Sequence, residues 1–373
     1  MKIALIGAKG IPSRISGLEI HAGIIAEGLA EHHKIYALCR KRYCSKLESN
    51  YNGIEIRYIP SVNTKHLDAV TYSFLATLYA VFIGCDVFWF HALGPACMAW
   101  IPGLLGKKVI STVHGLDWKR EKFGRLAEAV LKFGERSIAK CADEIIVLNE
   151  FDAAHFYGKW KRVCNIIPNG VECKTPKNAR VIKEKYGLDR KGYFLFMSRL
   201  VPEKNAHDLI AAYMKLKSDK KLVIAGKGVH TGGYERELKR MAALDKNIIF
   251  TGFVEGEILE ELYSNAYAYV LPSTIEGQSL GLLEAMSYGI PCIVSNIPEN
   301  VSVIGDAGIS FVNGNRADLE RQLRYVSEHP DIMEELGQRA KLRVKGRHDW
   351  SEIIQRTEEV FHLAETGKSG VHG

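Results

Sequence analysis

Residues 271–287 read LPSTIEGQSLGLLEAMS and combine the end of a strand, a polar loop and the start of a helix. The apolar run before Pro272 predicts a buried strand, and the helix is expected to begin near Ser279. Backbone N–H groups at a helix start bind anions such as phosphate. Glu276 in the loop and Glu284 inside the helix can accept hydrogen bonds from hydroxyl groups of the same ligand. The alternative is a helix-dipole role for Glu276 and a solvated helix position for Glu284.

Short apolar runs alternate with longer helical patterns on both sides of this segment. Continuous apolar strands separated by helices predict parallel sheets covered on both faces. The clearest predicted strands are residues 3–6, 35–39, 54–59, 87–90, 109–113, 145–148, 194–197, 222–225, 248–251, 268–271 and 292–295. In a chain of 373 residues, this number predicts an α/β protein of two doubly wound, Rossmann-like units that face each other across a cleft.

A change of unit is predicted near residues 165–172, NIIPNGVE, where Asn-Gly follows a proline and a polar stretch comes next. We therefore expect an N-terminal unit over residues 1–168 and a second unit over residues 169–349. The last periodic segment predicts a helix over 350–366. Residues 69–84 are apolar but fall short of the roughly 20 residues that span a bilayer, so they predict a buried helix.

Two cations follow the strand predicted at 194–197, in the sequence FLFMSRLVPEK. Arg199 and Lys204 lie on either side of a proline in the same loop. After a strand, such a pair can clamp a diphosphate and stabilise the charge that develops on it as a leaving group. By itself the pair is a weak signal, because basic side chains after a strand are usually solvated. The glutamate-containing segment at 271–287 makes the combination specific.

Two further loops that follow strands lie in the first half of the chain. His114 ends the strand of VISTVHGLD (109–117), which predicts an imidazole at the cleft, although a lone histidine is more often structural. The loop GAKGIPSRISG (7–17) resembles a dinucleotide fingerprint only loosely, but Gly17 would let the backbone approach a phosphate. Because IYALCR (35–40) ends without a ribose-binding acid, a nicotinamide dehydrogenase is disfavoured.

The net charge of +7 lies in one half of the chain. Residues 1–168 hold 22 Lys and Arg against 15 Asp and Glu, whereas residues 169–373 hold 28 of each. This excess favours an anionic partner of the first unit. The chain has no aromatic-basic RNA motif and no recognition helix, so we expect a membrane surface or a phosphorylated acceptor and not nucleic acid.

A helix over 122–140 is the expected contact with anionic lipid. Its predicted basic face consists of Arg125, Lys132, Arg136 and Lys140. Its predicted apolar stripe consists of Phe123, Leu126, Ala127, Val130 and Phe133. Arg40, Lys41 and Arg42 would extend the basic surface. The alternative is an ordinary solvated helix face.

The eight cysteines show neither a CxxC pair nor the spacing of zinc ligands. Several lie in apolar strands, where cysteine behaves as a small hydrophobic residue. The N-terminal sequence MKIALIGAKG reads as a strand and a glycine turn and not as a signal peptide. These features predict a cytoplasmic protein that lies, where it meets a membrane, on the inner face.

Taken together, the segments resemble the retaining glycosyltransferases of family 4, which have the GT-B fold. The resemblance runs almost end to end. It is carried by HGLD at 114–117, the Asn-Gly turn at 169–170, SRLVPEK at 198–204 and the pair formed by Glu276 and Glu284. The family usually crosses its last helix back to the first unit, which the resemblance implies for the helix at 350–366.

The resemblance also implies roles for the site residues. Arg199 and Lys204 would bind the donor diphosphate, Glu276 the transferred sugar and Glu284 the ribose. The other implied donor contacts are His114 beside the sugar, Gly17 beside the phosphates, Gly252, Phe253 and Val254 around the base, and Gly277, Gln278, Ser279 and Leu280 at the helix start.

The implied reaction is the retaining transfer of a hexose-type sugar from a nucleotide-diphosphate sugar to a saccharide or lipid-linked acceptor, in cell-surface polysaccharide synthesis. No cofactor or divalent metal is expected, and the sequence has no Asp-x-Asp motif after a predicted strand. Glu276 and Glu284 at helix spacing do not fit the carboxylate pair of a retaining glycosidase. We expect front-face transfer, in which the departing phosphate takes the acceptor proton and catalysis rests on positioning and electrostatics.

Two segments depart from the common family pattern. The chain has Gly277-Gln278-Ser279 in place of Gly-Phe-Gly and Ser16-Gly17 in place of Gly-Gly. Both segments touch the donor, so the identity of the donor stays open. Two alternatives also stay open, a nucleotide-sugar 2-epimerase of the same architecture and a non-catalytic protein that binds nucleotide sugars.

Overall fold

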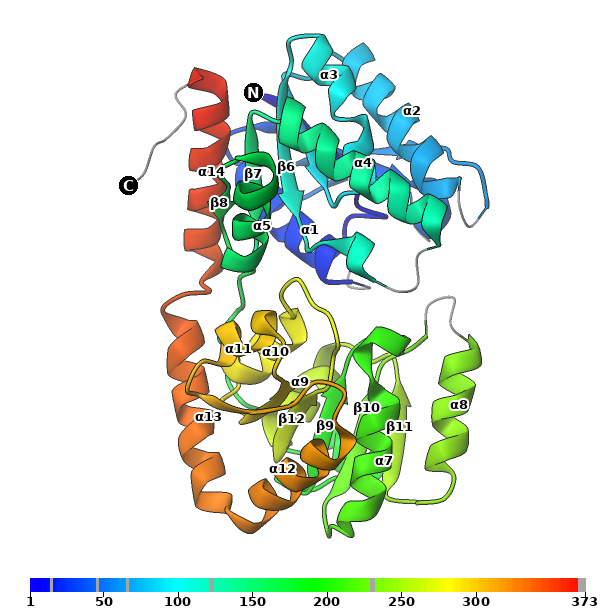
Figure 1. Cartoon of the computed structure of the whole chain (residues 1–373), viewed down its shortest axis with the longest axis vertical. Helices are drawn as coiled ribbons and strands as arrows, with labels where there is room; N and C mark the ends of the chain where they lie inside the picture. Colours follow the sequence, from blue (N-terminus) through cyan, green and yellow to red (C-terminus); the bar gives the residue numbers. More distant parts are fainter. Residues whose placement is uncertain (14–15, 45–46, 65–66, 121–123, 229–231, 368–373) are drawn as a thin grey trace. The chain divides into compact units, whose positions relative to one another are not determined.

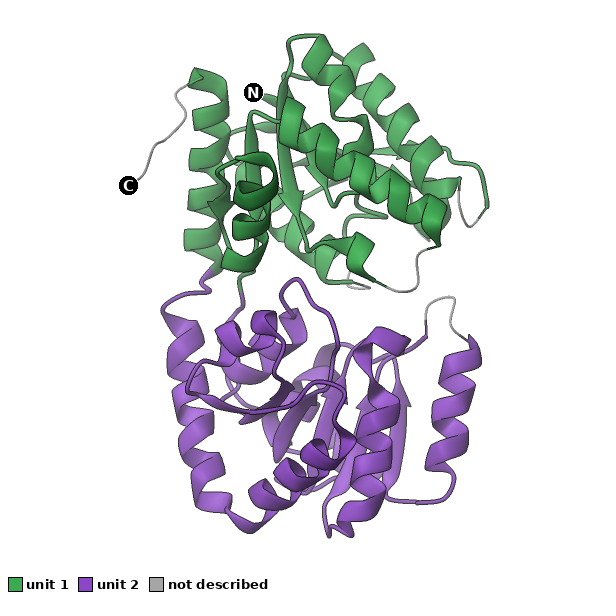
Figure 2. Ribbon diagram, in the orientation of Figure 1, with its two compact units in different colours: residues 1–170, 350–373 green, residues 171–349 purple. Residues whose placement is uncertain are grey.

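The structure is a computed structural model of the chain and divides into two compact units (Figure 2). It describes residues 1–373 except 14–15, 45–46, 65–66, 121–123, 229–231 and 368–373. Unit 1 consists of Met1–Gly170 and Trp350–Gly373, and unit 2 of Val171–Asp349. The predicted boundary after residue 168 lies two residues before this division.

Unit 1 contains a sheet with the strand order β3-β4-β2-β1-β5-β6-β7-β8 in the described residues. The strands are β1 (Lys2–Ile6), β2 (Lys34–Arg40), β3 (Asn50–Tyr51), β4 (Ile54–Ile59), β5 (Val87–His91), β6 (Lys108–Val113), β7 (Glu144–Val147) and β8 (Asn165–Ile166). Every pair is parallel except β3 with β4. The short strands β3 and β8 were not predicted, because two residues are too few for a periodic signal.

Helices cover both faces of this sheet (Figure 1). The helical segments of unit 1 are α1 (Gly17–Leu29), η1 (Lys41–Tyr43), α2 (Asp68–Phe82), η2 (Pro95–Met98), α3 (Trp100–Leu104), η3 (Asp117–Lys119), α4 (Arg125–Cys141), α5 (Glu150–Trp160) and α14 (Trp350–Thr366). Side chains of β5 show the alternation, since Phe88 and Phe90 join the core under α2 and α4, whereas Trp89 joins the core under α1 and α14. The Trp89 and Phe361 rings lie 5.3 Å apart, edge to face, so α14 is part of the core of unit 1.

Unit 2 contains a parallel sheet with the order β11-β10-β9-β12-β13-β14 in the described residues. The strands are β9 (Tyr193–Met197), β10 (Lys221–Ala225), β11 (Ile248–Gly252), β12 (Ala268–Leu271), β13 (Cys292–Ser295) and β14 (Gly308–Phe311). The helical segments are α6 (Val181–Tyr186), η4 (Pro202–Lys204), α7 (Ala206–Leu216), α8 (Gly232–Ala242), α9 (Gly256–Asn265), α10 (Leu280–Ser287), α11 (Pro298–Ile304), α12 (Arg316–Glu328) and α13 (Pro330–Lys345). The predicted fold class, two α/β units each built on a parallel sheet, is confirmed.

The predicted apolar stripe of α4 is wrong. Leu126 is 75% exposed and Phe133 51% exposed, whereas the buried face includes Leu131, Gly134 and Ile138. A Cβ at Gly134 would lie 1.9 Å from the Leu93 carbonyl oxygen, so only glycine lets the helix approach the η2 segment on this side. Ala127 and Val130 are half-buried, and Phe123 lies outside the described residues.

The predicted basic surface at residues 40–42 is also corrected. Arg40 is buried, and its Nη1 donates to Asp68 Oδ2 at 3.0 Å. Arg42 donates to the other oxygen of the same carboxylate at 3.3 Å. Arg40 is therefore removed from the surface, whereas Lys41 and Arg42 are exposed, and the single carboxylate of Asp68 offsets only one of the two guanidinium charges.

Candidate active site

The carboxyl edge of the unit 2 sheet contains a topological switch point between β9 and β12. From β9 the chain continues to β10 and β11 on one side, and from β12 to β13 and β14 on the other. Ligands of doubly wound sheets bind outside the carboxyl ends of the strands at such a point. Arg199 and Lys204 follow β9, and Glu276 follows β12. The order of the strands thus brings the two predicted motifs to the same place.

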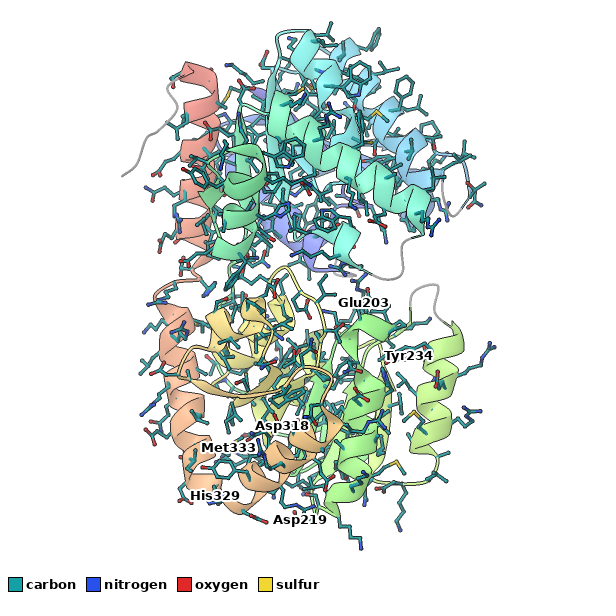
Figure 3. The ribbon with its side chains drawn as sticks, viewed as in Figure 1. Glu203, Asp219, Tyr234, Asp318, His329 and Met333 are labelled. Atoms are coloured by element: carbon teal, nitrogen blue, oxygen red, sulfur yellow. The ribbon has the colours of Figure 1, made fainter. Side chains whose placement is uncertain are left out.

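Lys204 and Glu276 form a buried ion pair. Lys204 Nζ donates to Glu276 Oε1, with side chains that are only 9% and 7% exposed. The loops that follow β9 and β12 are also joined through their backbones. Thr274 N donates to the carbonyl oxygen of Glu203 at 3.0 Å (Glu203 is labelled in Figure 3). Two charges removed from water need each other, so the pair holds the cation and the acid in one fixed arrangement.

The loop that carries Arg199 is tied to the end of β10. Ser198 N donates to the Ala225 carbonyl oxygen at 3.1 Å, and Leu200 N donates to that of Lys227 at 3.1 Å. The Arg199 side chain is half-buried, and no described residue forms an ion pair with its guanidinium. A fixed backbone with an uncompensated guanidinium is suited to an anionic ligand.

The start of α10 lies against the end of β9. Ser279 caps the helix, and its Oγ accepts from Leu282 N at 3.3 Å. A Cβ at Gly281 would lie 2.9 Å from the Tyr269 hydroxyl and 3.3 Å from the Met197 carbonyl oxygen. Glycine therefore allows the close approach, and the N–H groups of the first turn lie next to the loop of Arg199. Gly277 and Gln278 directly precede this cap, and Leu280 packs on the core.

Glu284 lies on α10 and is half-buried. Its Oε2 accepts from the buried Tyr263 hydroxyl of α9 at 3.0 Å. Burial raises the pKa of Tyr263 well above its usual value, and the charge of Glu284 raises it further. The tyrosine is therefore a permanent donor that orients one carboxylate oxygen. Tyr263 was not predicted, because its position on another helix carries no local signal.

The segment predicted to line a base pocket follows β11. Gly252 ends the strand with φ +71°, and its carbonyl oxygen accepts from Gly226 N at 2.8 Å. Phe253 is about half exposed and Val254 packs against the core. These contacts place the segment beside the end of β10, and its role towards a base remains a prediction.

Unit 1 collects three histidines at the carboxyl edge of its own sheet. His114 follows β6, and its Nε2 lies 3.0 Å from Nδ1 of His91, the last residue of β5. The ring of His21, from α1, lies 4.9 Å from that of His114. Only His114 was predicted. His91 had the same signal, a histidine at the end of an apolar strand, and His21 had none.

Burial keeps these imidazoles neutral. It lowers the pKa of His21 to about 4, and a hydrogen bond with the Asn169 side chain opposes this shift. It also lowers the pKa of His91 and His114 well below the usual value, and the neighbouring histidines add to the effect. Neutral imidazoles can donate and accept hydrogen bonds but carry no charge. His91 Nε2 is buried and has no hydrogen-bond partner among the residues that the structure describes.

Gly17 begins α1 directly after the loop that follows β1. Ser16 Oγ donates to the buried carboxylate of Glu19, whose other oxygen accepts from Lys9 N at 3.3 Å. Glu19 thus holds the two ends of the loop 9–16, of which residues 14–15 lie outside the described residues. The site residues of the first half, Gly17 and His114, both lie at the carboxyl edge of the unit 1 sheet.

Two known family models match the chain, one over most of each unit. The model for "Glycosyltransferase Family 4" matches residues 15–175, and that for "Glycosyl transferases group 1" matches residues 178–343. The chain is a glycosyltransferase of family 4. The resemblance in the motifs is thereby confirmed.

Relatives of this glycosyltransferase include two enzymes of Escherichia coli. O-antigen chain mannosyltransferase B is 28% identical over 194 residues, which are 51% of each chain. UDP-Gal:alpha-D-GlcNAc-diphosphoundecaprenol alpha-1,3-galactosyltransferase is 32% identical over 213 residues, which are 52% of each chain. The match thus spans about half the length of these curated relatives. The structure of sucrose-phosphate synthase from Thermosynechococcus elongatus covers 98% of the glycosyltransferase and 100% of its own chain, with a TM-score of 0.85 and 18% identity, which shows a common GT-B fold.

Proposed function

We propose that this glycosyltransferase transfers a hexose-type sugar from a nucleotide-diphosphate sugar to a saccharide or lipid-linked saccharide, with retention, in cell-surface polysaccharide synthesis. The observation that carries the proposal is the buried Lys204–Glu276 pair at the switch point of unit 2, next to Arg199. The two relatives from Escherichia coli are named for sugar transfer to O-antigen chains and to a lipid-linked diphosphate, which supports this class of acceptor.

The proposed mechanism uses positioning and electrostatics. Arg199, Lys204 and the N–H groups at the start of α10 stabilise the diphosphate as it leaves with the bond electrons of the sugar. Glu276 accepts hydrogen bonds from hydroxyls of the transferred sugar, and Glu284, oriented by Tyr263, accepts from the ribose. The acceptor hydroxyl attacks from the face that the diphosphate leaves, and a phosphate oxygen takes its proton. We propose that no metal or other cofactor takes part.

The ion pair has a specific advantage for this chemistry. Lys204 keeps its charge in the absence of donor because Glu276 compensates it in a buried place. When a diphosphate arrives, the ammonium group gains a second anionic partner without having to move. Preorganised charges of this kind cost no rearrangement during the reaction. The neutral His114 would contribute a hydrogen bond to the sugar and not a charge.

A panel of nucleotide sugars tested by thermal shift and by product analysis checks the proposal. We expect one donor to raise Tm, since specific binding at a hundredfold excess over Kd stabilises by about 2.7 kcal/mol. The same donor should give a product of retained anomeric configuration only when an acceptor is added. Conversion of the donor sugar without any acceptor would indicate an epimerase, and binding without product from any acceptor would indicate a non-catalytic protein.

We further propose that unit 1 contacts an anionic membrane, on the cytoplasmic side, through α2, α3 and α4. The helix α3 packs against both α2 and α4 (Figure 1). The exposed large apolar side chains of this surface are Phe74, Leu75, Leu78, Phe82, Trp100, Leu104, Leu105, Leu126 and Phe133. Phe82 is 86% exposed and Leu104 78% exposed. Apolar surface gathered in this way marks an interaction site.

The charges on the same surface favour lipid as the partner. Arg125, Arg136 and Lys140 of α4 are exposed, and Lys132 pairs with Glu128 at 2.6 Å. Each basic residue near an anionic bilayer contributes about 1 kcal/mol. In the described residues, no helix is long and apolar enough to cross a bilayer. Apolar side chains beside basic ones are typical of helices that lie in the interface plane.

Exchanging Phe82 and Leu104 together for glutamate should lower co-sedimentation with anionic liposomes at least tenfold. Each apolar side chain contributes about 1.5–3 kcal/mol when it is buried, and each new carboxylate is repelled by the lipid. Leu244→Glu is the matched control, because Leu244 is equally exposed but lies in unit 2. Equal partitioning into neutral and anionic liposomes would contradict the proposal. A change of oligomeric state without a change in liposome binding would indicate a second copy of the chain as the partner.

A further inference from the structure

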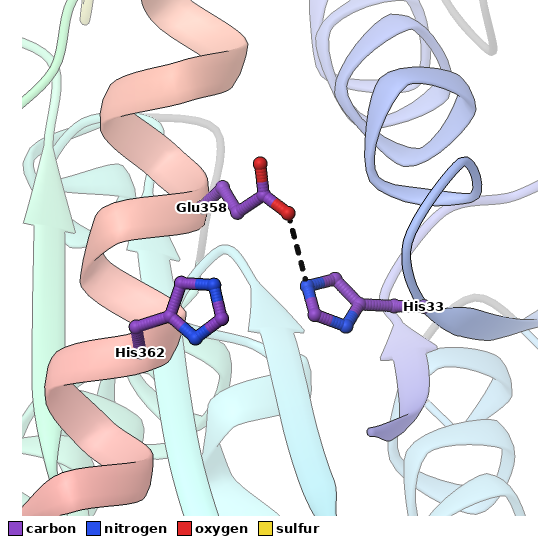
Figure 4. Close-up of side chains that lie close together, drawn as sticks. All are labelled: His33, Glu358 and His362. Atoms are coloured by element: carbon purple, nitrogen blue, oxygen red, sulfur yellow. Dashed lines mark ion pairs between the residues drawn. The ribbon is translucent and has the colours of Figure 1, made fainter.

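Three possible metal ligands gather where α14 packs beside the turn between α1 and β2 (Figure 4). Glu358 and His362 lie one helical turn apart on α14, and His33 lies directly before β2. One ligand atom from each of the three lies within 4.8 Å of those of the other two. Side chains four residues apart on a helix project from the same face, which is a chelating arrangement.

The distances place the imidazoles around one carboxylate. His33 Nε2 lies 3.3 Å from Glu358 Oε1, and His32 Nδ1 lies 2.9 Å from the same oxygen. The rings of His33 and His362 lie 5.8 Å apart. His33 Nε2 is buried and forms no hydrogen bond with any described residue, despite its short distance to the carboxylate. His33 Nε2 thus lies within ion-pair distance of the Glu358 carboxylate (dashed line in Figure 4), without the geometry of a hydrogen bond.

The backbone on both sides of the cluster is held in place. His33 N donates to the Leu29 carbonyl oxygen at 2.9 Å, and Lys34 N donates to that of Met1 at 3.0 Å. A Cβ at Gly28 would lie 2.6 Å from Ile354, so α1 and α14 pack closely. Ligands on rigid elements keep their geometry without help from a metal. The hollow beside them is lined by His32, His33, Gln355, Glu358, Glu359 and His362.

The donor set is that of zinc and similar divalent transition metals. Imidazole nitrogen and carboxylate oxygen bind zinc at about 2.0–2.2 Å, which puts tetrahedral ligand atoms about 3.3 Å apart. His362 is largely exposed, and its Nδ1 lies 3.7 Å from Glu365 Oε2, so a rotation of this side chain away from Glu365 would close the difference from 4.8 Å.

We propose that His33, Glu358 and His362 bind a divalent metal of the zinc class, with solvent completing the coordination. His33 lies before β2, at the amino edge of the sheet, whereas Gly17 and His114 lie at the carboxyl edge. The metal is therefore not part of the sugar-transfer chemistry. It connects the last helix of the chain to residue 33 and stabilises the fold of unit 1. This inference does not depend on the proposed function.

Calorimetric titration of the untagged chain with zinc chloride tests the site directly. We expect one equivalent to bind, and His33→Ala, His362→Ala and Glu358→Gln each to weaken binding at least tenfold. His329→Ala is the matched control, since it removes an imidazole of unit 2 that stacks on Tyr325 (His329 is labelled in Figure 3). Circular dichroism without metal establishes that each variant is folded.

Thermal unfolding gives a second measurement that does not need activity. Zinc at a hundredfold excess over Kd should raise Tm of unit 1 by about 5–10 °C in the parent chain and in His329→Ala. Zinc should raise Tm of unit 1 much less in His362→Ala. Saturable binding that survives all three ligand substitutions, an equal Tm rise in His362→Ala, or no saturable binding by the untagged chain would overturn the proposal.

Discussion

Replacing Lys204 with methionine should lower kcat/KM for the donor by about 10²–10³-fold. Methionine keeps most of the apolar stem and removes the ammonium group that stabilises the leaving diphosphate. Losing one preorganised donor to a developing anion costs about 2.7–4 kcal/mol in the transition state. Steady-state kinetics with the donor varied at saturating acceptor measure this loss. Lys239→Met is the control, because Lys239 is an exposed residue of α8 that pairs with Glu235 on the same helix.

The same substitution should also destabilise unit 2, and a double variant separates the two effects. Without Lys204 the buried carboxylate of Glu276 loses its ionic partner, which typically costs about 3–5 kcal/mol. Adding Glu276→Gln removes the uncompensated charge and should restore Tm but not activity. If Lys204→Met kept its activity while Tm fell, the pair would be structural and the proposed role of Lys204 would be wrong.

Gly226→Ala should destabilise unit 2 by about 2–6 kcal/mol, which corresponds to a fall in Tm of roughly 10 °C. Gly226 follows β10 with φ +138°, and a Cβ there would lie 1.9 Å from the Ser198 carbonyl oxygen. The Ser198 carbonyl oxygen belongs to the backbone and not to a flexible side chain, so the backbone must move to admit the Cβ. Ser198 directly precedes Arg199, and a displacement of about 1 Å at such a position can cost 10²-fold in rate.

Denaturant unfolding and donor titration of the same variant check both consequences. Gly233→Ala is the matched control, because Gly233 lies in α8 with open space around its Cα. That change should leave donor binding unaltered and stabilise the helix by up to about 1 kcal/mol. Should Gly226→Ala match this control in stability and donor affinity, the loop of Arg199 would not depend on the close contact with β10.

The sequence by itself determined the fold class and the longer strands, whereas β3, β8 and β14 of the described residues were not predicted. Runs such as residues 3–6 and 268–271 are apolar throughout, and that pattern is local, so it identifies strands buried on both faces. The position of Arg199, Lys204 and Glu276 after strands was equally local. Chain connectivity alone could not pair them, because the order β10-β9-β12 depends on which strands meet in the sheet.

The burial of α4 and the contacts of Glu284, His114 and Arg40 were decided only by the tertiary structure. The sequence of α4 offers apolar residues on two faces, and the face that is buried is the one where Gly134 permits close approach. Tyr263 contacts Glu284, His91 contacts His114 and Asp68 pairs with Arg40 across 21–28 residues of chain. Contacts between distant segments leave no periodic trace in the sequence, because they depend on how helices and strands pack and not on the pattern of any one of them.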